Sequence, residues 1–195
     1  MNLSSLADEK AVLRKRCYER RIRIEGGKAE AAALTVAERV GELIDIADGT
    51  VVSAYWPLPG ELDPRPALAL LSRRGAAPTL PRTVAEGRPL DFHAWLPDDP
   101  LIEGRFKVME PASDAPIVRP NILLVPLLAF DRHCRRLGHG KGYYDRTLQG
   151  LKADDPGVRA IGVAFAAQEV ERVPTDDFDQ TLDMVITEQT VHRPA

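Results

Sequence analysis

Proline is concentrated in the middle of this chain of 195 residues, and it limits the secondary structure that can form there. Thirteen of the 16 prolines lie between Pro57 and Pro126. Proline has no backbone N–H, and its ring clashes with the preceding helical turn, so long helices are excluded from this region. We expect short strands and ordered loops instead, including a strand at 90–95, and one helix over 66–74.

Helix signals dominate the first fifty residues. Ser5 and Asp8 have the spacing of an N-cap pair, which predicts a charged amino-terminal helix. A Gly-Gly pair at 26–27 then interrupts the chain. Thr35 and Glu38 match a second capping box, so we expect the next helix to begin at Thr35.

Strand patterns alternate with helix patterns along the rest of the chain. Strands are expected at 50–56, at an apolar run ending at Pro126, at 158–165 and at 181–187, with a helix over 143–151. This alternation predicts an α/β fold, a layered and mostly parallel sheet flanked by helices, in a single domain spanning 1–195. In such sheets ligands bind beyond the carboxyl ends of the strands.

Composition excludes several classes of protein. The chain is 44% hydrophobic and 28% charged, with a net charge of −3 and a pI near 5.8, which argues against a nucleic-acid partner. Its two cysteines form neither a disulfide framework nor a metal motif. The first ten residues are too polar for a secretion signal, and no apolar run is long enough to span a membrane. We therefore expect a cytoplasmic protein.

A glycine-rich basic segment follows the apolar run that ends at Pro126. Gly138, Gly140 and Gly142 alternate with other residues, and Arg136 and Lys141 add positive charge. Glycines free the backbone, and successive N–H groups at the start of a helix attract anions. The segment therefore predicts a phosphate cradle, although the pattern alone also fits a flexible, solvated turn.

The residues around this loop resemble the signature of the 5-formyltetrahydrofolate cyclo-ligase family. The glycine-tyrosine part of the match is specific, and the weaker pieces fall in the family's order along almost the whole chain. The matching segments are Lys10-x-x-x-Arg14, Gly60-Glu61-Leu62-Asp63, Glu110-Pro111, Phe130-Asp131-Arg132, Arg136-Leu137-Gly138-x-Gly140-Lys141-Gly142-Tyr143-Tyr144-Asp145-Arg146 and Leu182-Asp183.

The resemblance implies an ATP site in which Lys141 and Arg136 are catalytic. Without it, Lys10 and Arg14 read as a solvated helix surface, because other arginines make this helix basic all round. The ATP-binding residues that it implies are Lys10, Arg14, Arg136, Leu137, Gly138, His139, Gly140, Lys141, Gly142, Tyr143 and Tyr144.

It also implies a folate pocket next to the loop. Glu61 would accept hydrogen bonds from the pterin edge, and Trp56 and Phe106 would line its apolar side. From the residues alone, Trp56 also fits a hydrophobic anchor and Glu61 a surface carboxylate. The substrate-binding residues that it implies are Trp56, Glu61, Phe106, His139, Gly140, Lys141, Gly142 and Tyr143.

Asp145 and Asp183 match metal-binding positions of the family, and Mg²⁺ prefers such oxygen ligands. Neighbouring Asp179 is an alternative to Asp183. Two positions depart from the family pattern: His139 stands where Tyr or Arg is common, and Cys134 where Gly is common. If position 134 needs a left-handed backbone, the cysteine there would make the turn before the loop differ slightly from that of the family.

The resemblance implies ATP-dependent cyclisation of 5-formyltetrahydrofolate through a phosphorylated formyl group, with Mg²⁺ as cofactor. The expected partners are 5-formyltetrahydrofolate and ATP, with no membrane partner, and we expect a monomer. Two alternatives stay open: another nucleotide-dependent kinase or ligase, and a non-catalytic paralogue that binds folate or nucleotide.

Overall fold

The computed structural model describes residues 5–194 and is organised around one seven-stranded sheet. Its strand order is β11-β10-β9-β6-β1-β2-β3, and the five central strands are parallel, so the predicted α/β class is confirmed. The strands are β1 (Val51–Ser53), β2 (Ala77–Arg82), β3 (Asp91–Ala94), β6 (Ile122–Val125), β9 (Arg159–Val163), β10 (Met184–Ile186) and β11 (Val191–His192).

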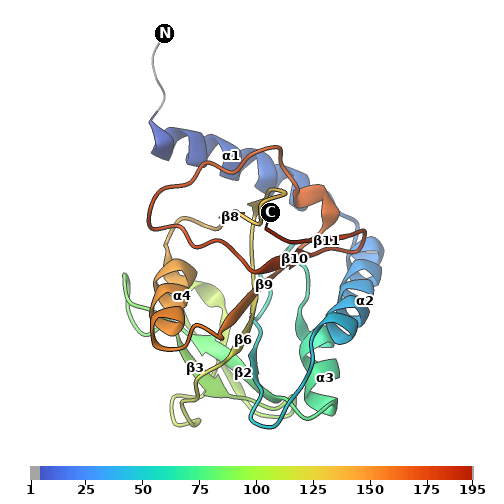
Figure 1. The fold of residues 1–195 in the computed structure, drawn as a ribbon, viewed down its shortest axis with the longest axis vertical. Coiled ribbons are helices and arrows are strands. Elements are labelled where there is room, and N and C mark those ends of the chain that lie inside the picture. The colour runs from blue at the N-terminus through green and yellow to red at the C-terminus, as the bar shows by residue number, and fades with distance from the viewer. Residues whose placement is uncertain (1–4, 195) are drawn as a thin grey trace.

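Helices cover both faces of this sheet (Figure 1). The helices α2 (Gly26–Leu43) and α3 (Arg65–Arg73) pack on one face, and α4 (Tyr143–Asp154) packs on the other. The alternation of buried side chains explains the two layers, because Leu124 of β6 joins the first core and its neighbour Leu123 the second.

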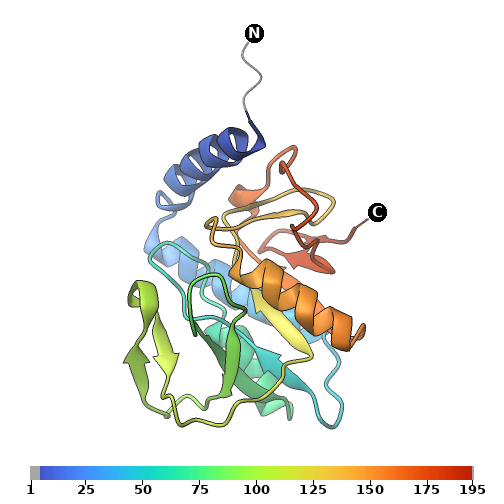
Figure 2. The same ribbon diagram turned by 90° about the vertical axis from the view of Figure 1, so that its left-hand side faces the viewer.

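The helix α1 (Leu6–Arg21) lies across one end of the sheet rather than on a face (Figures 1 and 2). Its Leu13 and Cys17 pack against a small core that includes Leu137 and Val173. The predicted cap is present, since Ser5 Oγ accepts from the Asp8 N–H and the Asp8 carboxylate accepts from the Ser5 N–H. The capping box therefore determines where α1 begins.

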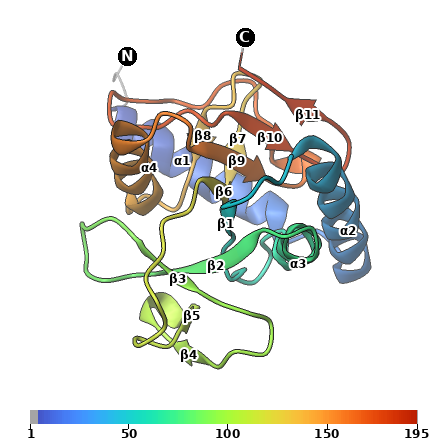
Figure 3. The ribbon, with the colours of Figure 1, turned by 60° about the horizontal axis from the view of Figure 1, so that its bottom comes forward.

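Two small hairpins complete the fold. The hairpin of β7 (Ala129–Phe130) and β8 (Arg136–Leu137) follows β6. The hairpin of β4 (Leu101–Glu103) and β5 (Met109–Pro111) lies beside the β2–β3 end of the sheet (Figure 3). The short 3₁₀ segments η1 (Arg105–Lys107) and η2 (Ala166–Gln168) lie in connections.

The second helix begins earlier than predicted. The expectation of a start at Thr35 is wrong, because α2 begins at Gly26 and Thr35 lies inside it. Its hydroxyl donates to the carbonyl of Ala31, one turn earlier. An alanine-rich stretch with high helix propensity carries the helix through this region, so a capping-box spacing can occur without a helix start.

The predicted strand at 50–56 is also shorter in the structure, since β1 ends at Ser53. The chain then leaves the sheet toward Pro57. Within residues 5–194, no helix has both the length and the apolar character needed to cross a membrane. Residues 1–4 of the polar amino-terminal stretch lie outside the described part of the chain.

Candidate active site

A cavity of about 1270 Å³ opens at the carboxyl ends of β1 and β6. Its walls come from α1, the start of α4, the loop after β1 and the β4–β5 hairpin. The structure brings together at its wall all but one of the predicted site residues, the exception being Asp183. They are Lys10, Arg14, Trp56, Glu61, Phe106, Arg136, Leu137, Gly138, His139, Gly140, Lys141, Gly142, Tyr143, Tyr144 and Asp145.

The glycine loop joins β8 to α4 and has a backbone that larger residues resist. Gly140 and Gly142 have φ values of +91° and +65°, in the left-handed region. Gly142 is the N-cap of α4. The free N–H groups of the first turn of α4 therefore begin at the cavity, where they favour a bound anion.

Arg14 of α1 holds the base of this loop. Its Nε donates to the Gly138 carbonyl at 3.0 Å. A Cβ added to Gly140 would lie 3.1 Å from the Arg14 guanidinium carbon. Because the glycines have no side chains, the Arg14 guanidinium can lie directly against the loop. The helix α1, which is distant in sequence, thereby adds a cation to the loop.

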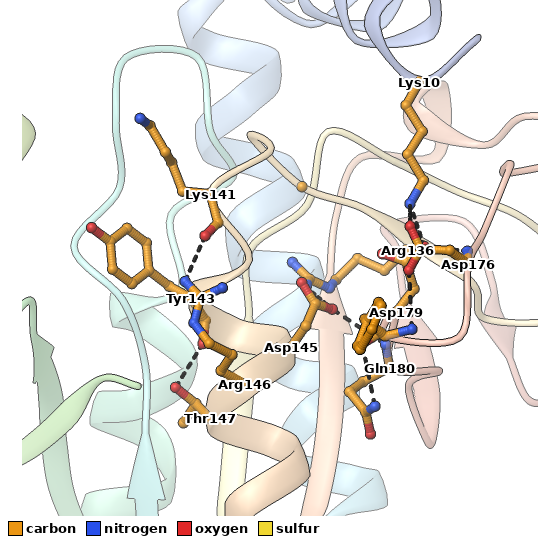
Figure 4. Close-up of polar contacts among 12 residues, drawn as sticks. Lys10, Arg136, Lys141, Tyr143, Asp145, Arg146, Thr147, Asp176, Asp179 and Gln180 are labelled. Carbon is orange, nitrogen blue, oxygen red and sulfur yellow. Dashed lines mark hydrogen bonds and ion pairs between the residues drawn. The ribbon is translucent and has the colours of Figure 1, made fainter. Parts of the chain in front are cut away.

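Arg136 and Asp145 form a partly buried ion pair beside the loop (Figure 4). Arg136 Nη2 donates to Asp145 Oδ1 at 2.7 Å, and the Gln180 N–H donates to the same oxygen at 3.2 Å. Within residues 5–194, Asp145 Oδ2 and the buried Nε of Arg136 have no hydrogen-bond partner. One oxygen of the Asp145 carboxylate thus remains available for a further partner.

Lys10 reaches the opposite side of the same region from α1. Its Nζ lies 2.7 Å from Asp176 Oδ2 and 2.5 Å from Asp179 Oδ2. Partial burial alone would lower the pKa of Lys10, but its hydrogen bonds to the two carboxylates outweigh burial and raise it. Lys10 is therefore a fixed cation held by two acids, and Asp176 is a cavity residue that sequence reasoning missed.

Lys141 contributes mainly its backbone to the site. Arg146 Nη2 donates to the Lys141 carbonyl at 2.6 Å, whereas Lys141 Nζ pairs with the exposed Glu86 at 3.1 Å. Figure 4 shows the ammonium pointing away from Asp145. Arg146 is a further cation at the cavity wall. It is the last residue of the glycine-tyrosine motif, so its position in that motif could have identified it as a site residue.

Glu61 provides a buried carboxylate at the other end of the cavity. Its side chain is only 5% exposed. Oε2 accepts from the Leu58 N–H at 2.9 Å, and Oε1 lies 2.9 Å from His139 Nε2 and 3.4 Å from Arg21 Nη1. The interpretation of Glu61 as a surface carboxylate is therefore wrong.

Arg21 lies on a buried part of α1. A helix that is basic all round is typical of a solvated surface, but the Arg21 residue is only 2% exposed. It follows Leu13 and Cys17 at four-residue spacing, which places all three on the buried side of α1. This spacing was a signal that could have identified Arg21 as a support for Glu61.

Aromatic side chains line the cavity around Glu61. The Trp56 ring is half-buried and stacks under the Arg65 guanidinium at 4.6 Å. Phe106 has a left-handed φ of +59°, is exposed, and lies 6.2 Å from the Tyr143 ring centre. The hydroxyls of Tyr143 and Tyr144 are buried without a hydrogen-bond partner in residues 5–194.

The structure does not bring Asp183 to this cavity. The residue precedes β10, so it lies at the amino ends of the parallel strands, away from their carboxyl ends. Its carboxylate binds Lys152 Nζ and the Ala160 N–H. Within residues 5–194 no group of three or more His, Cys, Asp or Glu side chains is placed to hold a metal. Asp179, the alternative, does line the cavity.

Cys134 occupies the turn before the loop and has a φ of +59°. Its backbone does adopt the left-handed conformation that glycine enters without strain. The turn is held by the fully buried Asp131, which accepts hydrogen bonds from the N–H groups of His133, Arg135 and Val173.

The fold and the site together define an α/β protein with a glycine-rich basic loop and an adjoining aromatic pocket in one cavity. Residues 7–188 match the model of the 5-formyltetrahydrofolate cyclo-ligase family. The chain belongs to this family, and the resemblance inferred from its sequence is confirmed.

Individual relatives agree with this assignment. The 5-formyltetrahydrofolate cyclo-ligase of Escherichia coli K12 is 35% identical over 146 residues, covering 72% of this chain and 79% of the relative. That of Haemophilus influenzae is 31% identical, covering 77% and 82%. A solved structure, 5,10-methenyltetrahydrofolate synthetase of Aquifex aeolicus, is 31% identical, with a TM-score of 0.79 and coverage of 94% and 92%.

Proposed function

We propose that this protein converts 5-formyltetrahydrofolate to 5,10-methenyltetrahydrofolate with consumption of ATP and release of ADP and phosphate. One observation carries the proposal: a single cavity joins the glycine loop and its cations to the pocket around Glu61. Family membership and the names of the relatives support the folate substrate. The use of ATP and two free thiols fit the cytoplasmic location expected from the sequence.

The loop end of the cavity would bind the triphosphate. Backbone N–H groups at the start of α4 and the cations Lys10, Arg14, Arg136 and Lys141 supply the positive field that a polyphosphate needs. The loop residues that would contact ATP are Leu137, Gly138, His139, Gly140, Gly142, Tyr143 and Tyr144.

The Glu61 end would bind the pterin. A pterin carries N–H donors along its aminopyrimidine edge, and a buried carboxylate is the matching acceptor. Trp56, Phe106 and Tyr143 supply aromatic surface for its flat faces. His139 of the loop reaches Glu61, so the formyl group and the terminal phosphate would meet beside the loop.

Asp145 is the residue best placed to hold Mg²⁺. Its Oδ1 is taken by Arg136 and the Gln180 N–H, whereas Oδ2 is free within the described residues. One carboxylate fits Mg²⁺ bound mainly through phosphates and water. When bound there, the ion would neutralise phosphate charge. Asp179 is the nearest alternative that also lines the cavity.

The reaction would proceed in two steps. The formyl oxygen attacks the γ-phosphorus, the bond to ADP breaks, and an iminium phosphate forms. N10 then attacks the activated carbon and closes the ring, its proton passes to the phosphate or to water, and phosphate leaves as the C–O bond breaks. The residues contribute positioning and charge stabilisation, the main demands of phosphoryl transfer. Arg136 would contact the transferred group, and the exposed ammonium of Lys141 would join it by exchanging Glu86 for the phosphate.

The direct test is the ultraviolet spectrum of the purified protein mixed with 5-formyltetrahydrofolate and MgATP. We expect the methenyl chromophore to appear, with one phosphate released for each methenyl group formed. ADP in place of ATP should give no chromophore. Failure of the native, folded protein to form the chromophore would overturn the proposal.

The same assay separates the two alternatives. A different kinase or ligase would consume ATP with another acceptor while leaving 5-formyltetrahydrofolate unchanged. A non-catalytic paralogue would bind folate or nucleotide in a calorimeter and release no phosphate. Lys141→Ala is the variant to compare with the native protein in this assay, because the substitution removes an exposed side chain and leaves the core packed.

A further inference from the structure

His139 connects the two ends of the cavity through a single contact. Its Nε2 lies 2.9 Å from Glu61 Oε1, across 78 residues of sequence. The imidazole comes from the glycine loop, and the carboxylate comes from the loop after β1. A residue of the proposed phosphate-binding loop therefore occupies the acceptor that we assign to the pterin.

Both oxygens of Glu61 already have partners. Oε2 accepts from the Leu58 N–H, and Oε1 faces His139 and Arg21. Oε1 already faces two donors and has no acceptor site left, whereas Oε2 has one. A pterin edge that bonds to both oxygens must therefore replace a partner of Oε1.

Of these partners, His139 is the one placed to leave. Leu58 donates through its backbone, and the Arg21 side chain is 1% exposed with a second contact to the Leu127 carbonyl. The His139 side chain is 43% exposed. It also lies between two glycines, which let the loop change backbone angles at low cost.

We infer that His139 is a positioning residue that couples folate binding to nucleotide binding. The inference rests on the proposed function and deepens it. In the arrangement of this structure, the imidazole holds the Glu61 carboxylate and turns the loop toward the folate pocket. Binding of the pterin edge displaces the imidazole, and the released loop turns its N–H groups and the imidazole to the triphosphate.

The inference predicts opposite effects on the two ligands. Removing the imidazole removes a competitor, so His139→Ala should bind 5-formyltetrahydrofolate about fivefold more tightly when no nucleotide is present, the effect of one hydrogen bond. Bound folate should improve the affinity of the native protein for a non-hydrolysable ATP analogue on the order of tenfold, and this factor should fall to near one in His139→Ala.

Calorimetric titration measures both affinities without turnover. Each ligand is titrated alone and in the presence of the other, and the coupling factor must be equal from either side. His133→Ala is the matched control, because His133 contacts Arg132 and does not line the cavity. His139→Gln keeps a side-chain donor and should restore part of the coupling factor. In a Glu61→Gln background, His139→Ala should no longer change folate affinity, since its partner is altered.

Each outcome decides the inference. Unchanged or weaker folate binding in His139→Ala, or a native coupling factor of one, would overturn it while the methenyl assay still supports the proposed function. A native protein that neither binds folate nor forms the methenyl product would overturn the proposed function itself. Tighter folate binding together with loss of coupling, absent from His133→Ala, would support the inference.

Discussion

Arg14 and Gly138 are 124 residues apart in sequence, and the Arg14 Nε donates to the Gly138 carbonyl at 3.0 Å. This bond joins α1 directly to the glycine loop. It leaves the Arg14 guanidinium at the cavity wall, where its remaining N–H groups face the region proposed for the triphosphate. The amino-terminal helix is thereby part of the candidate site.

The first prediction concerns the charge of Arg14. Arg14→Glu should weaken ATP binding about tenfold or more, because it replaces a charged donor at the loop with a repelling carboxylate. Arg20→Glu and Arg23→Glu change the net charge equally but lie on exposed positions of the same region. Calorimetry at two salt concentrations separates a local effect from a screened field effect. Equal weakening by all three reversals would remove Arg14 from the site.

The second prediction compares two cations that flank the loop. Lys141→Ala should reduce turnover about 10²–10³-fold, the usual loss for one donor that stabilises developing charge. Its stability should change by less than about 1 kcal/mol, because its Glu86 pair is exposed. Arg136→Ala should lower both turnover and melting temperature, since it strands the partly buried Asp145 carboxylate. Normal turnover of either folded variant would exclude that residue from catalysis.

The sequence predicted local features better than long-range ones. Ser5 and Asp8 identified the start of α1 because both partners of the cap lie within one turn. The similar spacing at Thr35 failed, since alanine-rich sequence on its amino-terminal side extends the helix past it. The capping-box spacing shows that a cap can form at a residue. The helix propensity of the neighbouring residues decides whether the helix begins there.

Local sequence patterns also predicted some residues of the candidate site better than others. The loop motif located Arg136 and Asp145 correctly at the cavity, because strand, loop and helix follow one another in the chain. Asp183 was placed by a linear match that carries no information on which edge of the sheet a strand presents. Arg21 was missed although it continues the four-residue spacing of Leu13 and Cys17, because an arginine on that side of α1 needs a buried partner such as Glu61, which only the tertiary structure reveals.

The third prediction concerns magnesium. Asp145→Asn keeps the shape and the acceptor for Gln180 but removes the charge, so half-maximal activity should require much more Mg²⁺. Asp183→Asn is the matched comparison, because that carboxylate binds Lys152 outside the cavity. We expect its magnesium titration to follow that of the native protein. A shifted curve for Asp183→Asn and an unchanged one for Asp145→Asn would reverse the assignment.

The fourth prediction concerns the thiols. Burial raises the pKa of Cys134 to about 11, and burial also raises the pKa of Cys17. At pH 8 the Cys134 thiolate is then roughly one thousandth of the total, and the thiolate is the reactive form. Ellman's reagent should therefore react slowly with the folded protein and rapidly after denaturation. Fast reaction of a native cysteine at pH 8 would contradict its burial.

The last prediction separates the two ends of the cavity through Glu61. Glu61→Gln exchanges one carboxylate oxygen for an N–H₂ donor, so either the pterin edge or Arg21 meets a mismatch in a buried setting. Folate affinity should fall by roughly 1–3 kcal/mol, about fivefold to 150-fold, the cost of a buried polar group left without its partner. Affinity for a non-hydrolysable ATP analogue should not fall, because Glu61 reaches the glycine loop through His139, whose release favours nucleotide binding.

Asp63→Asn is the control for this change. It removes a carboxylate two residues away that binds Arg65 outside the main cavity. Melting curves of both variants show whether a loss of affinity follows from a loss of stability, since Glu61 also faces the buried Arg21. If Glu61→Gln weakens the nucleotide and spares the folate, Glu61 belongs to the nucleotide end of the cavity, and the pterin must bind through other acceptors.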